Sequence, residues 1–138
     1  MRRFPTYPDA ALLVIRLILF VSFLLHGLMK LNMGLSNVGA GFAKMGVPMA
    51  SVAGPGIAIL ETVGAIALLV GLGTRIVALL LVCDMLGAIT FVHGKHGYTA
   101  QGGMELVALL GTLALALVLA GAGRYSIDAR MGRGDTAP

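Results

Sequence analysis

Four long apolar runs dominate the pattern of hydrophobic and polar positions along this chain. They cover about residues 9–33, 50–72, 74–93 and 102–120. Each run is close to the roughly 20 residues that a helix needs to cross the hydrocarbon core of a bilayer. Lipid offers no partner for backbone amides and carbonyls, so a single segment crosses economically only as a helix. The pattern therefore predicts an all-α integral membrane protein with four transmembrane helices in one domain, residues 1–138.

The links between the runs indicate how these helices are arranged. Residues 71–75 are so few that the second and third helices must be antiparallel neighbours. Residues 34–49 are rich in glycine but carry Phe42, Met45 and Val47. That link fits a segment that lies along the membrane interface or re-enters the bilayer, and it equally fits an ordinary surface loop. We expect an antiparallel four-helix bundle.

Composition supports the membrane interpretation. The chain is 58% hydrophobic and 12% charged, whereas soluble domains are about 45–50% apolar and about 25% charged. The net charge of +4 could indicate a nucleic-acid partner. However, the basic residues stand at the ends of the apolar runs and form no solvated patch. We therefore interpret them as topology signals, expect contact with membrane lipid, and expect no nucleic-acid partner.

Basic residues are enriched at the cytoplasmic ends of membrane spans. One side of the predicted bundle carries Arg2, Arg3, Arg75, Arg124, Arg130 and Arg133. The other side carries Lys30, Lys44 and Lys95. This asymmetry predicts that both termini are cytoplasmic.

Ionisable side chains inside or at the ends of the runs are the candidate functional groups. A charge at the bilayer centre costs roughly 2.5–3.5 kcal/mol on insertion scales, so such residues normally face the bundle interior and mark a ligand or proton site. The candidates are Arg16, His26, Lys30, Glu61, Asp84, His93 and Glu105.

Counting about 1.5 Å of helix rise per residue from each cytoplasmic end predicts two layers of these groups. The inner layer contains Arg16, Glu61 and Asp84. The outer layer contains His26, Lys30, His93 and Glu105. In the inner layer, Arg16 could hold one carboxylate bidentately. The second carboxylate would then share Arg16, stay protonated or contact water, and this would make a proton-accepting site. The alternative is a purely structural Arg–carboxylate lock between helices.

Helical periodicity assigns faces to the same groups. Arg16, His26 and Lys30 lie on one stripe of the first run. The face that carries Glu61 is otherwise small or apolar: Gly54, Ala58, Ala65 and Leu68. The face that carries Glu105 holds Ala108, Thr112 and Ala116. Small residues let helices approach closely, so we expect both carboxylates at helix contacts.

Other roles for the histidines and for Lys30 stay open. Lys30 could extend to the headgroups, and His93 could be an interfacial residue. His26 and His93 could ligate haem, and the same pair with Glu105 could hold another metal. Spacing alone is a weak indicator of either, so we expect neither haem nor a metal.

Several segments, in their order and spacing over roughly residues 10–128, resemble the DoxX family of small four-helix bacterial membrane proteins. The segments are Arg16 with His26-Gly27-Leu28-Met29-Lys30, Gly46-Val47-Pro48, Glu61-Thr62-Val63-Gly64, Gly71-Leu72-Gly73-Thr74-Arg75, Gly102-Gly103-Met104-Glu105 and Tyr125-Ser126-Ile127-Asp128.

The resemblance implies a protein of the bacterial inner membrane and a link to quinone chemistry, since the family is named after a subunit associated with quinone-linked sulfur oxidation. Our first hypothesis is a redox-accessory subunit, whose own catalytic activity stays open, that binds a quinone-like ligand and couples to a soluble oxidoreductase. His26, Lys30 and Arg16 could donate hydrogen bonds, and Glu61, Asp84 or Glu105 could exchange protons.

Two further hypotheses come from other classes of protein. The first is a non-catalytic scaffold or assembly factor in which the buried charges only specify packing. The second is a small transporter or proton-coupled carrier, which is weakened by the lack of clearly broken helices. The small-residue faces would also permit a homodimer.

Overall fold

A computed structural model describes residues 5–132 of the chain, and within that range it is helical without a strand. The basic residues Arg2, Arg3 and Arg133 lie outside the described residues. The elements are α1 (Pro8–Met33), α2 (Leu35–Lys44), α3 (Ala50–Val70), α4 (Thr74–Ala88), η1 (Ile89–His93), η2 (Gly94–His96), α5 (Glu105–Ala120) and α6 (Ile127–Arg130). The all-α prediction is thereby confirmed.

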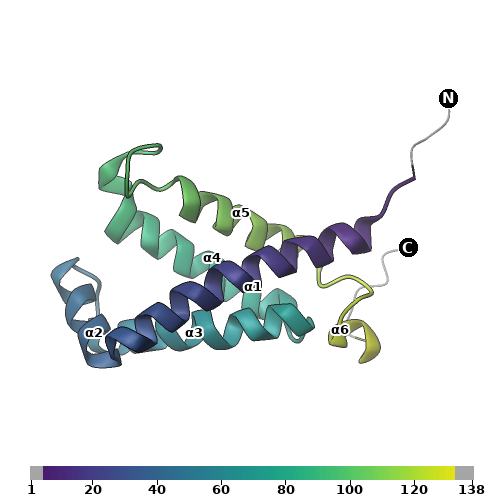
Figure 1. Ribbon diagram of the computed structural model, residues 1–138, viewed down its shortest axis with the longest axis horizontal. Coiled ribbons are helices and arrows are strands. Elements are labelled where there is room, and N and C mark those ends of the chain that lie inside the picture. The colour runs from purple at the N-terminus through teal and green to yellow at the C-terminus, as the bar shows by residue number, and fades with distance from the viewer. Residues whose placement is uncertain (1–4, 133–138) are drawn as a thin grey trace.

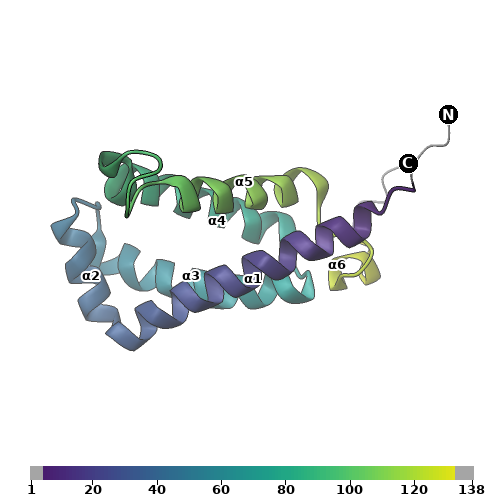
Figure 2. The ribbon, with the colours of Figure 1, turned by 45° about the horizontal axis from the view of Figure 1, so that its top comes forward.

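The four long helices are arranged as two pairs. α1 packs along α3, and α4 packs along α5. Figures 1 and 2 show the pairs converging beside α6 and diverging toward α2. The convergent end, which also holds the start of α4, is called the terminal end below; the opposite end, covered by α2 and η1, is the cavity end.

Three helical stretches are long and apolar enough to cross a bilayer: Pro8–Met33, Ala50–Val70 and Thr74–His96. The third continues from α4 through η1 and η2. α5 is apolar but has 16 residues, which at about 1.5 Å per residue gives about 24 Å against a hydrocarbon core of about 30 Å. Three predicted spans therefore have the required length, and the fourth span and the orientation of the bundle stay predictions.

Most of the link between the first two runs forms a helix. α2 begins directly after Gly34, whose φ of 89° turns the chain out of α1. Its buried face rests on the first turns of α3, where a Cβ on Gly54 would lie 2.8 Å from the backbone of Gly39. The two glycines thus allow close backbone contact. The sequence did not reveal this helix, because glycine lowers helix propensity by about 1 kcal/mol per residue.

The bundle buries only one narrow face of each helix. Its core contains Leu19 and Phe23 of α1, Leu68 of α3, Leu81 of α4 and Leu117 of α5. Large apolar side chains also point outward: Ile76 is 70% exposed and Leu119 is 72% exposed. Apolar side chains spread over the outer surface are what a lipid-facing bundle requires.

Candidate functional site

A cavity of about 510 Å³ lies at the cavity end, among α1, α3, the α4–η1 stretch and α5. Its volume falls in the range of roughly 300–1,000 Å³ that is typical of small-molecule sites. Its wall includes five of the seven predicted site residues: His26, Lys30, Glu61, Asp84 and His93. The structure therefore brings together groups from three helices and from both predicted layers.

The rest of the wall is apolar or glycine. It includes three phenylalanines and three methionines, and the link residues Phe42, Met45 and Val47 contribute to it. The apolar and glycine residues of the wall are Phe23, Met29, Phe42, Met45, Val47, Ile57, Met85, Gly87, Ala88, Phe91, Val92, Gly102, Gly103, Leu106, Val107 and Leu110. A mostly apolar wall with a few polar groups is the composition typical of small-molecule sites.

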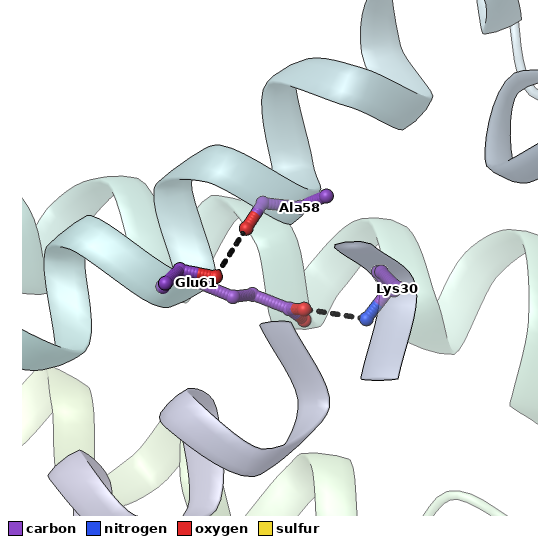
Figure 3. Close-up of polar contacts among 4 residues, drawn as sticks. Lys30, Ala58 and Glu61 are labelled. Atoms are coloured by element: carbon purple, nitrogen blue, oxygen red, sulfur yellow. Dashed lines mark hydrogen bonds and ion pairs between the residues drawn. The ribbon is translucent and has the colours of Figure 1, made fainter. Parts of the chain in front are cut away.

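Lys30 of α1 and Glu61 of α3 form an ion pair in the cavity wall. The Lys30 Nζ donates to Glu61 Oε2 over 2.5 Å, as Figure 3 shows. The side chains are 18% and 4% exposed. Close packing of the two helices makes this pair possible, because a Cβ on Gly27 would lie 2.7 Å from the Thr62 amide nitrogen.

The two predicted layers of charge are wrong, since the Lys30–Glu61 pair joins them. Depth was counted from the end of each helix, and the helix ends are not level. Arg16, nine residues into α1, lies opposite Leu68 near the end of α3. The first two turns of α1 therefore extend past α3, and residues late in α1 lie deeper in the bundle than the count implied.

Within the described part of the chain, Asp84 of α4 contributes a buried polar atom without a partner to the cavity wall. The residue is 8% exposed, and its Oδ2 finds no hydrogen-bond partner among the described residues. Glu61 and Lys30 are close enough for their charges to act on it. A buried carboxylate oxygen without a donor is costly, because burial has removed the water that would otherwise solvate it. The cavity thus contains an unused acceptor.

The two cavity histidines differ in their hydrogen bonding. His93 ends the π-helical turn η1, an irregularity that is frequent at functional sites. Its Nδ1 lies 2.8 Å from the Gly102 carbonyl oxygen. A carbonyl only accepts, so Nδ1 must donate, and in the neutral ring Nε2 is then an acceptor. His26 is half-buried one turn before Lys30 and lines the same cavity.

Arg16 lies at the terminal end and is absent from the cavity wall. Its guanidinium donates to the carbonyl oxygens of Leu68 (2.7 Å), Leu69 (2.5 Å), Ala122 (3.1 Å) and Tyr125 (2.7 Å). The last carbonyls of a helix lack intrahelical partners, and a positive charge is favourable there. Arg16 therefore closes the end of α3 and ties it to the segment before α6.

The prediction that Arg16 holds Glu61 or Asp84 is wrong. The donors of its guanidinium are directed at backbone carbonyls. Nearly two helical turns separate its partner Leu68 from Glu61, so that carboxylate is instead within reach of Lys30. Arg16 does join helix ends, as the structural alternative expected, but its partners are backbone carbonyls and not a carboxylate.

Asp128 was not among the predicted site residues. Its Oδ1 accepts from the Gly73 amide (2.8 Å) and its Oδ2 from the Thr74 amide (2.9 Å). These amides begin α4, where a negative charge offsets the helix dipole. An N-cap normally precedes its helix, whereas this carboxylate comes from 54 residues further along the chain. Local sequence therefore gave no signal beyond the presence of Asp128 in the family-like segment.

Glu105 is exposed at the first residue of α5 and is not part of the cavity wall. The predicted helix contact for this residue is wrong, because the buried face of α5 consists of Val107, Leu110, Ala114 and Leu117. By contrast, the prediction for Glu61 is confirmed, since every residue predicted to share its face is buried. Among residues 5–132, no three His, Cys, Asp or Glu side chains are grouped to hold a metal ion.

Comparisons with known proteins agree with the family resemblance. A family model described as DoxX matches residues 11–94, more than half of the chain. An uncharacterized protein of Haemophilus influenzae is 35% identical over 133 residues, covering 93% of this chain and 96% of that protein.

Two further relatives have more specific names. A Bacillus subtilis protein named "Putative oxidoreductase CatD" is 34% identical over 107 residues, 76% of each chain. An uncharacterized membrane protein of Mycobacterium tuberculosis is 31% identical and covers 92% of this chain and 85% of its own length. No solved structure matches the chain.

Proposed function

The chain belongs to the DoxX family, and on this basis we propose that it is a redox-accessory membrane subunit that binds a quinone-like molecule in the cavity at its cavity end. The observation that carries the proposal is the composition of the wall. An apolar enclosure of about 510 Å³ contains an ion pair and a buried carboxylate oxygen without a partner. A buried charge within a membrane segment costs free energy, and such residues usually mark a functional site.

The residues of the wall suit a flat ring with oxygen substituents. Phe23, Phe91 and Met85 would contact the faces of the ring. Lys30 has N–H donors beyond the one bound to Glu61, and Asp84 supplies an acceptor. A quinone-like ligand would supply reversible uptake of two electrons and two protons.

The carboxylates of Glu61 and Asp84 would exchange the protons of that ligand at their oxygen atoms. Both lie in the wall, and neighbouring charges act on Asp84. The electrons would pass to or from a soluble oxidoreductase. The name of the Bacillus subtilis relative supports a redox setting.

The same proposal includes the setting of the protein. It places the bundle in a bacterial inner membrane with both termini in the cytoplasm and α5 as a short fourth span. The cavity end would then face the outer leaflet. Two copies could also associate through their small-residue faces. Ligand binding would not require this dimer, because the cavity is formed within one chain.

A scaffold or assembly function is the second candidate, and one observation favours it. At the terminal end, Arg16 donates to four backbone carbonyls and Asp128 accepts from two backbone amides. Charge in this protein therefore does serve packing. Under this alternative, Lys30 and Glu61 would also only join α1 to α3, and no small molecule would copurify.

The test is solvent extraction of protein purified in a mild detergent that retains lipid, with chromatography and an absorbance spectrum of the extract. The proposal expects about one quinone per chain in the wild type and in Glu105→Gln, a carboxylate change outside the cavity. Asp84→Leu should lose the quinone while folding in normal yield. A wild-type extract that contains lipid but no quinone would overturn the proposal and favour the scaffold.

A further inference from the structure

The first observation concerns the orphaned oxygen of Asp84. A carboxylate oxygen accepts hydrogen bonds and cannot donate when ionised. Asp84 is more than nine-tenths buried, lines the cavity and has no partner for Oδ2 among the described residues. While Asp84 is ionised, a donor that reaches this oxygen from the cavity would relieve the cost of burying it. A ligand that presents another acceptor at this position would increase that cost.

The second observation concerns the tautomer of His93. Its Nδ1 is committed as a donor to Gly102 O over 2.8 Å, so in the neutral ring Nε2 carries a lone pair. His93 belongs to η1 and Asp84 to α4, one element earlier in the chain. Two residues of the cavity wall, Asp84 and His93, therefore each carry an acceptor atom.

The donors of the wall are already partly used. Lys30 directs one N–H at Glu61 Oε2. His26 can donate or accept, so it favours neither kind of ligand. The wall contains the carboxylates of Glu61 and Asp84 but only one ammonium group, that of Lys30. Hydrogen-bond acceptors therefore outnumber donors among its charged groups.

From this balance we infer that the cavity binds the reduced, hydroxyl-bearing form of its ring ligand more tightly than the oxidised dione form. A hydroquinone-type diol presents an O–H donor at each end of the ring, whereas the dione presents only acceptors. The Asp84 oxygen and the His93 Nε2 match the diol. This inference rests on the proposed function and adds to it a preference for one redox state.

The experiment compares tetramethyl-1,4-benzoquinone with its reduced diol. The two probes have nearly the same shape, and their fully substituted ring leaves no open carbon for addition of the Cys83 thiol. Equilibrium dialysis under argon measures binding to detergent-purified protein, with detergent alone on the reference side to correct for partition. We expect the diol to bind at least about tenfold more tightly, since a hydrogen bond to a charged group contributes roughly 1.5–3 kcal/mol.

A matched pair of variants then assigns the preference to Asp84. Asp84→Asn keeps the shape of the side chain but adds an N–H donor, so the diol should lose about tenfold in affinity and the dione should gain. Glu105→Gln makes the same chemical change on an exposed residue outside the cavity and should keep the wild-type preference. The wild-type measurement stands without either variant, so misfolding of Asp84→Asn would not remove the test.

The possible outcomes distinguish failure of this inference from failure of the proposed function. Equal binding of the two probes, or tighter binding of the dione, overturns the preference and leaves the proposed function standing. A wild-type preference that persists in Asp84→Asn overturns the assignment to Asp84. If neither probe binds, the proposed function and the inference fail together.

Discussion

The terminal end and the cavity end of the bundle use buried charge in opposite ways. At the terminal end, Arg16 donates to four backbone carbonyls and Asp128 accepts from two backbone amides. At the cavity end, Lys30 pairs with Glu61, but one oxygen of Asp84 has no partner within residues 5–132. The charges at one end complete the helix termini, whereas the other end buries an acceptor in a residue that lines a cavity.

The proposed function assigns the charges of the terminal end to the stability of the fold and those of the cavity end to a ligand. Hydrogen bonds to unpaired helix-terminal groups remove a desolvation cost that the backbone would otherwise carry. A buried, unsatisfied carboxylate instead costs stability. In the described part of the terminal end, the Thr74 hydroxyl oxygen also lacks a partner, but a neutral hydroxyl is far less costly to bury than a carboxylate. Substitutions at the two ends should therefore separate stability from ligand binding.

Arg16→Leu should have the largest effect. It removes the donors from four backbone carbonyls at once, and each buried group left unpaired costs about 1–3 kcal/mol. We expect the free energy of unfolding to fall by about 4 kcal/mol or more, measured by thermal or denaturant unfolding in detergent. Arg130→Leu, a charge removal at an exposed site of the same end, should stay within about 0.5 kcal/mol. Near-wild-type stability of Arg16→Leu would show that the buried charge at the terminal end does not stabilise the fold, which contradicts the contrast between the two ends.

Gly27→Ala should be the next most damaging change. The added methyl group would overlap Thr62 and push α1 away from α3, at a cost of roughly 1–3 kcal/mol. It should also weaken the Lys30–Glu61 pair that the close contact permits. Gly56→Ala is the control, because a Cβ there meets no atom within 4 Å and alanine is the better helix former. Equal stability of the two variants would show that the α1–α3 contact is looser than described.

Asp128→Ala should cost about 0.5–2 kcal/mol, the usual value of an N-cap. The amides of Gly73 and Thr74 would lose their acceptor at the start of α4. Asp9→Ala removes a carboxylate that accepts from a single amide, that of Arg124, in an exposed position, and its effect should be smaller. Unfolding curves of the two variants measured side by side test this order, and a reversed order would contradict the role of Asp128.

Asp84→Asn should have the smallest effect on stability. Without ligand, the substitution replaces a costly buried charge by a neutral amide, so the free energy of unfolding should stay unchanged or rise slightly. Its effect should instead appear in weaker binding of the diol form of the ligand. A fall in stability comparable to that of Arg16→Leu would show that Asp84 is a packing residue, and the two ends would then be alike.

Periodicity made the local parts of this structure predictable. The apolar runs gave α1, α3 and α4, and the helical repeat placed Glu61 on the buried face of α3. The same repeat failed for Glu105, because a carboxylate in the first turn of a helix is stabilised by the dipole and can remain exposed. The position of Glu105 in the first turn of α5 therefore decided its exposure, and the small residues on the same helix face did not.

Relations between distant segments were not accessible from the sequence. The stagger of α1 against α3 decides that Lys30, and not Arg16, reaches Glu61. The cap that Asp128 places on α4 joins residues 54 positions apart. Neither follows from local pattern, since both depend on how helix ends align in three dimensions. Five of the seven predicted site residues nevertheless lie around one cavity, because intramembrane charges tend to gather away from lipid.

Native mass spectrometry of the gently purified protein tests the central contrast most directly. The account predicts one adduct of constant mass per chain in the wild type and in Asp9→Ala at the terminal end, and no adduct in Asp84→Leu at the cavity end. A bare chain mass for the wild type, in a preparation that still retains lipid, would contradict the account. An adduct that survives in Asp84→Leu would equally contradict it, because the ligand would then bind without the carboxylate that distinguishes the cavity end.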